Sequence, residues 1–276
     1  SVLKKGDRMV KANVTIDGAA FREEGWLVMR GAIEPGELAA IDAAVCDVAG
    51  WAEADGPGLH HFEQTDAGAV LARSEDFIEH HDVLRAFICD GLITRVLGEL
   101  FGEPAVLFKE KVNYKHPGGG GFAPHQDAPA YRFIDHHISC MVPLDPATEQ
   151  SGCLYVAPVP DAGSSTSPGR GSMMMTDERG RIDESLSAGL AWRPVPLDPG
   201  DLLFFDSYTP HYSDTNSSDR PRRAAYLTYN AASRGDFRDR YYADKRADFA
   251  LAGDDFDGER VRISIIDDFL GRPAQR

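Results

Sequence analysis

The period of hydrophobic positions changes part-way along the chain. Up to about residue 104, apolar residues recur at helical spacing, and Pro35 stands at the start of one such segment. The buried face expected for this helix consists of Leu38, Ile41, Val45 and Val48. A second amphipathic helix is expected over about residues 82–100, with the apolar face Leu84, Phe87, Ile88, Leu92, Val96 and Leu100. The polar stretch 52–75 between them predicts a loop that contains His60 and His61.

From residue 105 the pattern becomes that of short β-strands separated by Gly and Pro. Strands are expected at 105–108, 111–114, 138–144, 153–157, 201–205 and 224–229. One more short strand is expected within 26–31, after a helix that ends near Gly25. Helices followed by many short strands are typical of a β-sandwich or jelly roll braced by helices. We therefore expect a mainly β protein with flanking helices.

Composition and charge narrow the class of protein. A chain of 276 residues that is 42% hydrophobic and 26% charged is expected to be a soluble globular protein with a sizeable core. Its net charge of -15 opposes binding to nucleic acid or to an anionic membrane. Because no long apolar run or apolar signal core is present, we expect neither membrane insertion nor export, and hence a cytoplasmic location. The four cysteines form no CxxC pair and are expected to be buried, reduced thiols.

A possible metal motif stands out among the polar residues. His125 and Asp127 lie at alternate positions of one extended segment, and His211 could complete three ligands on one face of a metal. This is the two-histidine, one-carboxylate set of non-haem Fe(II) oxygenases. His-x-Asp alone is common among ordinary surface or core residues. The context favours a ligand role, because His211 follows the apolar strand at 202–205 and Arg222 leads directly into the strand at 224–229.

Two glycine-rich segments, 118–121 and 162–172, are expected to be mobile and could gate entry to the metal site. A phosphate-binding loop is the alternative interpretation of residues 118–121. The run lacks the Gly-Lys-Ser/Thr ending and the helix start that such a loop requires.

With these residues in place, the chain resembles the phytanoyl-CoA dioxygenase-like family of Fe(II)/2-oxoglutarate oxygenases, from Gly25–Gly31 to the Pro-Arg-Arg at 221–223. The resemblance implies a double-stranded β-helix of the jelly-roll, cupin-like type in a single domain over 9–276. Its helical N-terminal part would span about 9–104, its jelly-roll core about 105–235 and a C-terminal extension 236–276.

The same resemblance implies cofactors and roles for particular residues. Fe(II) is expected on His125, Asp127 and His211, with O2 as the oxidant. The C5 carboxylate of 2-oxoglutarate is expected on Arg222. The neighbouring Arg223 is the alternative, but adjacent residues of a strand face opposite sides, so only one of the two should enter the barrel.

Further pocket residues are expected on the strand at 108–114. Lys109, Lys111 and Asn113 alternate and so share one face. By resemblance, Asn113 would donate to a 2-oxoglutarate carboxylate and Lys109 would pair with an anionic group, while Lys111 could equally face solvent. Ser139 is a candidate for the same pocket. Tyr131 and Arg132, which follow the metal motif in the sequence, could contact substrate or belong to an ordinary loop. The remaining paired histidines are expected to be structural or surface residues: His60, His61, His80, His81, His136 and His137.

The expected reaction is hydroxylation of an unactivated C–H bond in a small polar, anionic substrate. Residues 108–131 resemble the branch of the family that hydroxylates 2-aminoethylphosphonate, and the cationic residues near the site fit an anion. Asp127 disfavours halogenation, because a small residue there would be needed to admit halide.

Several alternatives stay open. The same oxidation could act on a secondary metabolite, an amino-acid derivative or an acyl thioester, and could give desaturation, ring formation or epimerisation. A metal-dependent cupin-type hydrolase or isomerase would not use 2-oxoglutarate or need Arg222. A binding protein without metal should have lost a ligand, and all three are present. A small molecule is the expected partner, and the sequence does not indicate an oligomeric state.

Overall fold

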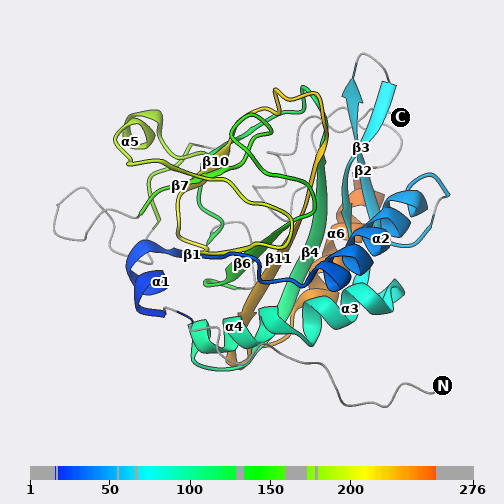
Figure 1. Ribbon diagram of the computed structural model, residues 1–276, viewed down its shortest axis with the longest axis horizontal. Coiled ribbons are helices and arrows are strands. Elements are labelled where there is room, and N and C mark those ends of the chain that lie inside the picture. Colours follow the sequence, from blue (N-terminus) through cyan, green and yellow to red (C-terminus); the bar gives the residue numbers. More distant parts are fainter. Residues whose placement is uncertain are drawn as a thin grey trace.

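Two antiparallel β-sheets form the centre of the molecule (Figure 1). The computed structural model describes residues 16, 18–54, 56–65, 68–128, 134–158, 173–177 and 180–252. Within these residues the large sheet contains, in spatial order, β1 (Trp26–Met29), β9 (Leu202–Asp206), β6 (Ile138–Pro143), β11 (Arg222–Ala231), β4 (Ala105–Lys115), β3 (Gly68–Glu75) and β2 (Leu59–Thr65). The small sheet contains β5 (Phe122–His125), β10 (His211–Ser213), β7 (Leu154–Val156) and β8 (Arg193–Val195).

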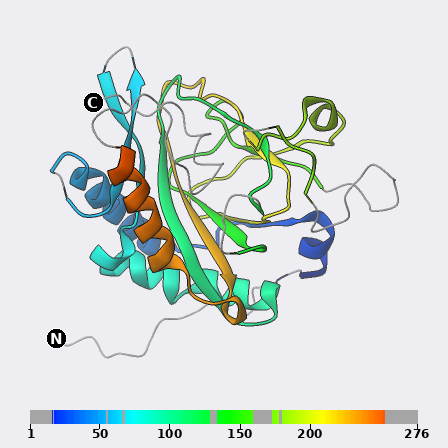
Figure 2. The same cartoon turned by 180° about the vertical axis from the view of Figure 1, so that it is seen from behind.

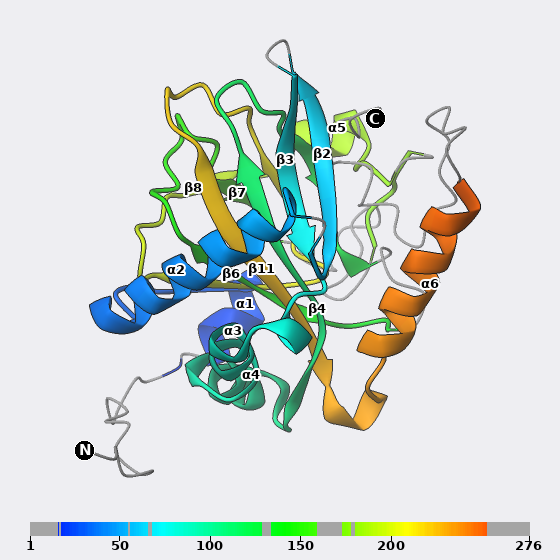
Figure 3. The ribbon, with the colours of Figure 1, turned by 90° about the vertical axis from the view of Figure 1, so that its right-hand side faces the viewer.

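The helices are gathered mainly on one face of the large sheet. They are α1 (Gly18–Glu24), α2 (Pro35–Trp51), α3 (Asp82–Cys89), α4 (Leu92–Phe101), α5 (Glu184–Ala188) and α6 (Arg238–Ala252), with 3-10 turns η1 (Ile78–His80) and η3 (Ala232–Arg234). Figure 3 shows α2, α3 and α4 in front of the large sheet. Figure 2 shows α6 running beside β4. The opposite face of the large sheet is left to meet the small sheet, which confirms the predicted jelly-roll class.

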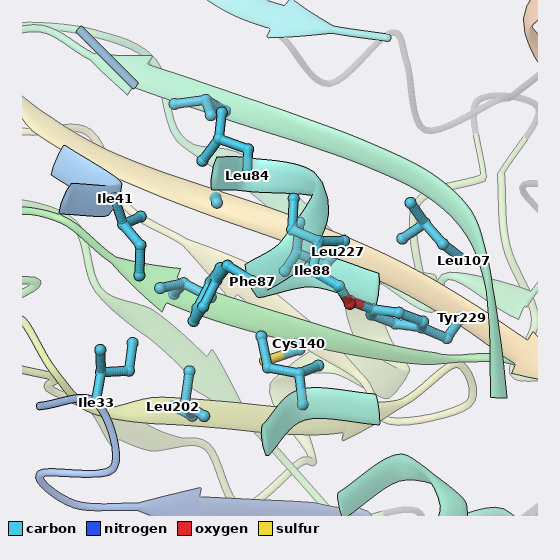
Figure 4. Close-up of a cluster of buried hydrophobic side chains, with 14 of the residues drawn as sticks. Ile33, Ile41, Leu84, Phe87, Ile88, Leu107, Cys140, Leu202, Leu227 and Tyr229 are labelled. Atoms are coloured by element: carbon cyan, nitrogen blue, oxygen red, sulfur yellow. The ribbon is translucent and has the colours of Figure 1, made fainter. Parts of the chain in front are cut away.

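Apolar side chains fill both interfaces of the large sheet. The layer between helices and sheet contains the predicted faces of α2, α3 and α4 (Figure 4), with Ile41, Leu84 and Phe87 packed near Leu227 and Tyr229 of β11. A second cluster between the sheets includes Met141, Val156, Leu203 and Phe205. Burial on both faces explains why β9 is apolar at every position from 202 to 205, and β6 at every position except Ser139, instead of alternating. No helix in the described ranges is long and apolar enough to cross a membrane.

The helix expected over 82–100 is in fact two helices. Gly91 has extended dihedral angles (φ -128°, ψ -151°) and separates α3 from α4. A Cβ at this position would lie 3.1 Å from the Phe87 carbonyl oxygen, so the close turn favours glycine. The apolar face continues across the break, and this continuity is why the periodicity suggested one helix.

The loop expected over 52–75 was also wrong, because β2 and β3 form a hairpin that joins the large sheet through β4. The sequence pattern does not indicate these strands, because they contain polar residues that form hydrogen bonds within the fold. His60 Nδ1 lies 3.0 Å from Ser74 Oγ. Similarly, β4 is one strand and not two, because its central Glu110 is buried and accepts from the Arg238 guanidinium of α6 at 2.6 Å.

The cysteines follow the expectation in part. All four thiols are free, and Cys140 and Cys153 are buried. Cys46 is exposed and Cys89 is half-buried, which corrects the prediction of burial for these two residues.

Candidate metal centre

Two neighbouring strands of the small sheet bring the His-x-Asp motif and His211 together. His125 ends β5, His211 begins β10, and the two residues lie directly opposite each other in the antiparallel pair. Each histidine Nε2 is 3.7 Å from Asp127 Oδ1. One potential ligand atom from each of the three residues lies within 4.8 Å of the others, and all three residues are buried. No other such group of His, Cys, Asp or Glu occurs among the residues that the structure describes.

Backbone carbonyl groups orient both imidazoles. His125 Nδ1 lies 2.6 Å from the Ala123 carbonyl oxygen, and His211 Nδ1 lies 2.9 Å from that of Thr209. Because a carbonyl oxygen only accepts, Nδ1 must carry the proton in each neutral ring. The Nε2 lone pairs are thereby left to face Asp127.

Burial and mutual charge set the protonation of this group. Burial, reinforced by the nearby His211, lowers the pKa of His125 to about 3. Burial by itself would raise the pKa of Asp127, but the charges of His211 and His125 outweigh it and lower that pKa. At neutral pH His125 therefore presents a free nitrogen lone pair and Asp127 a carboxylate. Two imidazoles with one carboxylate are a donor set that suits ferrous iron and leaves coordination positions open.

Hydrogen bonds and close packing of neighbouring residues hold the His-x-Asp segment in its conformation. Gln126 points away from the centre, where its Nε2 donates to the Tyr208 carbonyl oxygen at 2.6 Å and its Oε1 accepts from Met174 N at 2.7 Å. Alternation then directs His125 and Asp127 to one side. The glycine run before β5 has a packing role, since a Cβ on Gly121 would lie 2.3 Å from the Ser213 carbonyl oxygen.

The inner face of the large sheet supplies the wall opposite the motif. Ser139 Oγ lies 3.5 Å from Asp127 Oδ2, at the limit of a hydrogen bond, and 3.2 Å from Thr228 Oγ1. Thr228 is the register partner of Lys109, so this lysine lies on the same wall. Lys109 is buried, with Nζ 3.9 Å from Glu75 Oε1.

The other two residues predicted on this strand face also lie on that wall. Lys111 Nζ lies 5.5 Å from the centre of the Tyr226 ring. Its charge is one of the influences that lower the pKa of Asp127. Asn113 is buried, and its Oδ1 has no hydrogen-bond partner among the described residues.

The two adjacent arginines face opposite sides of β11, as alternation predicts. Arg222 is fully buried and donates from Nη1 to the Tyr226 hydroxyl at 3.3 Å. Its Nε and Nη2 have no partner in the part of the chain that the structure describes. Arg223 instead makes a two-pronged pair with Asp145, at 2.9 Å from Nε and 2.8 Å from Nη2, and also contacts Asp42 at 2.9 Å.

Sequence reasoning missed Lys115, which is the register partner of Arg222 and is also buried. Its Nζ donates to Ser213 Oγ at 3.0 Å and to the Asp214 carbonyl oxygen at 2.5 Å. The alternation that selected Lys109, Lys111 and Asn113 continues to position 115, and would have found this residue had it been extended.

The remaining candidates lie apart from the three clustered ligands or cannot be placed. His136 pairs with Asp206 at 2.7 Å on the partly exposed side of β9. His61 lies 3.7 Å from Glu75. Tyr131, Arg132 and the segment 162–172 are outside the described residues.

Comparison with known proteins places this geometry in a family. The family model "Phytanoyl-CoA dioxygenase (PhyH)" matches residues 21–224. The chain is 43% identical to a methylphosphonate hydroxylase of Gimesia maris, over 93% of this chain and 95% of that protein. It is 39% identical to a 2-aminoethylphosphonate dioxygenase from an uncultured bacterium, over 87% and 90%.

A solved structure shares the fold. EctD from S. alaskensis, solved with 2-oxoglutarate and 5-hydroxyectoine, has a TM-score of 0.64 at 22% identity and covers 83% of this chain and 82% of its own.

Fold and family together define a non-haem iron dioxygenase that uses 2-oxoglutarate and O2. The chain belongs to the phytanoyl-CoA dioxygenase family. The resemblance stated from the sequence, including the phosphonate-hydroxylase branch, is thereby confirmed.

Proposed function

We propose that His125, Asp127 and His211 hold the iron and that Arg222 binds the distal carboxylate of 2-oxoglutarate. The observation that carries the proposal is the clustering of two histidine nitrogens and one carboxylate, together with the buried guanidinium of Arg222 on β11, whose Nε and Nη2 have no partner among the described residues. A buried cation with unused donors is costly without an anion. The carboxylate of the co-substrate would supply one.

The protein's own groups then act by orientation and charge. The carbonyl groups beside both Nδ1 atoms hold the imidazoles with Nε2 toward the metal. Ser139 would steady the second oxygen of Asp127. The amide of Asn113 would donate to a 2-oxoglutarate carboxylate, and Lys109 would pair with an anionic group. Bound iron, together with 2-oxoglutarate and O2, supplies the oxidising power, and burial of the centre limits water at the reacting bond.

We propose further that the substrate is a small phosphonate, converted to its hydroxylated product while 2-oxoglutarate becomes succinate and CO2. Two relatives that align over most of this chain are named for methylphosphonate and 2-aminoethylphosphonate. Both molecules carry the phosphonate group. Lys109 and Lys111 on the wall of the large sheet give that group cationic surroundings, in a protein whose overall charge is -15.

We propose a single domain over 9–276 and a cytoplasmic protein that acts on a free small molecule, and not on nucleic acid or a membrane. The joining of β1, β2 and β3 from the N-terminal part to the sheet of the β core supports a single domain. The acidic charge supports a small-molecule partner, because it would repel polyanions.

Succinate formation tests the substrate class. Purified enzyme with Fe(II), 2-oxoglutarate and O2 is given methylphosphonate or 2-aminoethylphosphonate, with ethylamine and methanesulfonate as matched compounds that lack the phosphonate. We expect only the phosphonates to stimulate succinate formation, with a product that is heavier by one oxygen atom. Equal rates with and without phosphonate would refute the substrate class and leave the iron site to be judged separately.

A further inference from the structure

One end of the inner wall carries two buried cations side by side. Arg222 on β11 and Lys115 on β4 are directly opposite in the antiparallel pair, so their side chains leave the sheet on the same face. Both residues are buried. Only Arg222 was expected from the sequence.

Lys115 bridges the two sheets at this end. Its ammonium donates to Ser213 Oγ and to the Asp214 carbonyl oxygen, both at the end of β10. An ammonium has three N–H groups, so one has no oxygen or nitrogen acceptor among the described residues, where the ring centre of Phe122 lies 5.8 Å from Nζ. A Cβ on Gly152 would lie 2.7 Å from the ammonium nitrogen, so the glycine leaves the space that the ammonium occupies. The lysine is therefore held in place by the fold and retains a donor.

The surroundings of Lys115 favour its neutral amine form over its ammonium form. Burial, and next the positive charge of Arg222, lower the pKa of Lys115 to about 7. Asp214, Cys153 and Glu63 act in the opposite direction but do not compensate. Without a bound anion, Lys115 is therefore divided between its charged and neutral forms at neutral pH.

We propose that Lys115 is the second cation of the site for the distal carboxylate of 2-oxoglutarate, and that binding of this co-substrate is coupled to protonation of Lys115. The proposal rests on the role given to Arg222 above. An incoming carboxylate places a negative charge beside the lysine and favours its ammonium form. Binding and proton uptake are thus linked, each favouring the other.

The affinity for 2-oxoglutarate should fall as pH rises above 7. Well below pH 7 the lysine is already charged, so 2-oxoglutarate binds without taking up a proton. Above pH 7 each binding event must first charge the lysine, and affinity falls as pH rises until the pKa of the complex is reached. If the complex has a pKa of about 9, linkage gives a roughly sixfold weaker Kd at pH 8.5 than at pH 7.5.

Calorimetry measures the proton directly. Fe(II)-loaded protein is titrated anaerobically with 2-oxoglutarate at pH 8, in two buffers of different ionisation enthalpy, and 2-oxopentanoate serves as the isostere without a distal carboxylate. We expect uptake of more than half a proton per 2-oxoglutarate in the wild type and none per 2-oxopentanoate. Lys115→Met should abolish the uptake and flatten the pH dependence of Kd. Arg220→Met, which removes an exposed cation two residues before Arg222, should retain both.

The outcomes separate this inference from the proposed function. If Lys115→Met keeps the proton uptake while Arg222→Met loses 2-oxoglutarate binding, Lys115 is only structural and the inference is wrong. If Arg222→Met binds 2-oxoglutarate normally, the assignment of the carboxylate site fails and the inference fails with it. Lys115→Arg covers the case of a Met variant that does not fold. Arginine carries a permanent charge, so the Lys115→Arg variant should bind 2-oxoglutarate without proton uptake. Proton uptake by this variant would overturn the proposal.

Discussion

Replacing Arg222 by Met should separate binding of 2-oxoglutarate from stability of the protein. The side chain is fully buried, and two of its nitrogens have no partner among the described residues. Removing one partner of a buried, hydrogen-bonded charge pair costs about 3–5 kcal/mol. The Kd of 2-oxoglutarate should therefore rise at least about 100-fold. The protein without co-substrate should be no less stable, because an uncompensated buried cation is removed as well.

Arg223→Met is the matched control, one position along the same strand. This side chain faces Asp145 and Asp42 and is partly exposed, so its loss should lower stability by about 1 kcal/mol and leave the Kd of 2-oxoglutarate unchanged.

The assay is anaerobic titration of Fe(II)-loaded protein with 2-oxoglutarate, followed by the weak visible charge-transfer band of the chelate, together with thermal melts with and without co-substrate. A raised Kd in Arg223→Met with a normal Kd in Arg222→Met would show that the wrong arginine has been assigned to the pocket.

Three other changes test separate parts of the account. Asp127→Asn should lower iron affinity at least about tenfold by removing the anionic ligand, and metal titration with atomic absorption would show unchanged loading if Asp127 is no ligand. Gly121→Ala places a Cβ 2.3 Å from the Ser213 carbonyl oxygen and should lower Tm by several degrees, whereas Gly120→Ala, with nothing within 4 Å, should not; equal melts would mean that β5 and β10 are not so closely packed. Burial lowers the pKa of His61 to about 4, below its ordinary value of 6.5, so its neutral form stabilises the fold above pH 6.5 and this contribution is lost as pH falls from 6.5 toward 4. Substituting His61→Phe should flatten the fall of Tm with pH in this window, and an unchanged slope would assign acid sensitivity to other groups.

The strands of the β core could be predicted from the sequence wherever their buried side chains are apolar. The segment at 202–205 is fully apolar and buried on both faces, so its composition alone identified β9. Alternation along β11 likewise separated Arg222 from Arg223, because the side on which a strand residue lies is a local property. The family resemblance, and not the alternation, selected Arg222 for the inner side, and in the structure Arg222 is buried while Arg223 pairs with Asp145.

Elements held together by buried charges escaped detection. Glu75 of β3 contacts Arg73, and also Lys245 of α6 at 2.5 Å. Glu110 of β4 likewise pairs with Arg238 of α6. The α6 partners Lys245 and Arg238 are distant in the chain and leave no local periodicity, and charged residues in a short segment suggest a loop. For this reason the sequence predicts a loop in place of the β2–β3 hairpin and two strands in place of β4.

An iron centre built from His125, Asp127 and His211 should bind 2-oxoglutarate. The most direct measurement is anaerobic addition of 2-oxoglutarate to Fe(II)-loaded wild-type protein and to His211→Ala, with His136→Ala as a control outside the three ligands. We predict that the visible charge-transfer band appears in the wild type and in His136→Ala, and is lost in His211→Ala. No band in wild-type protein of verified iron content, or an undiminished band in His211→Ala, would contradict the account.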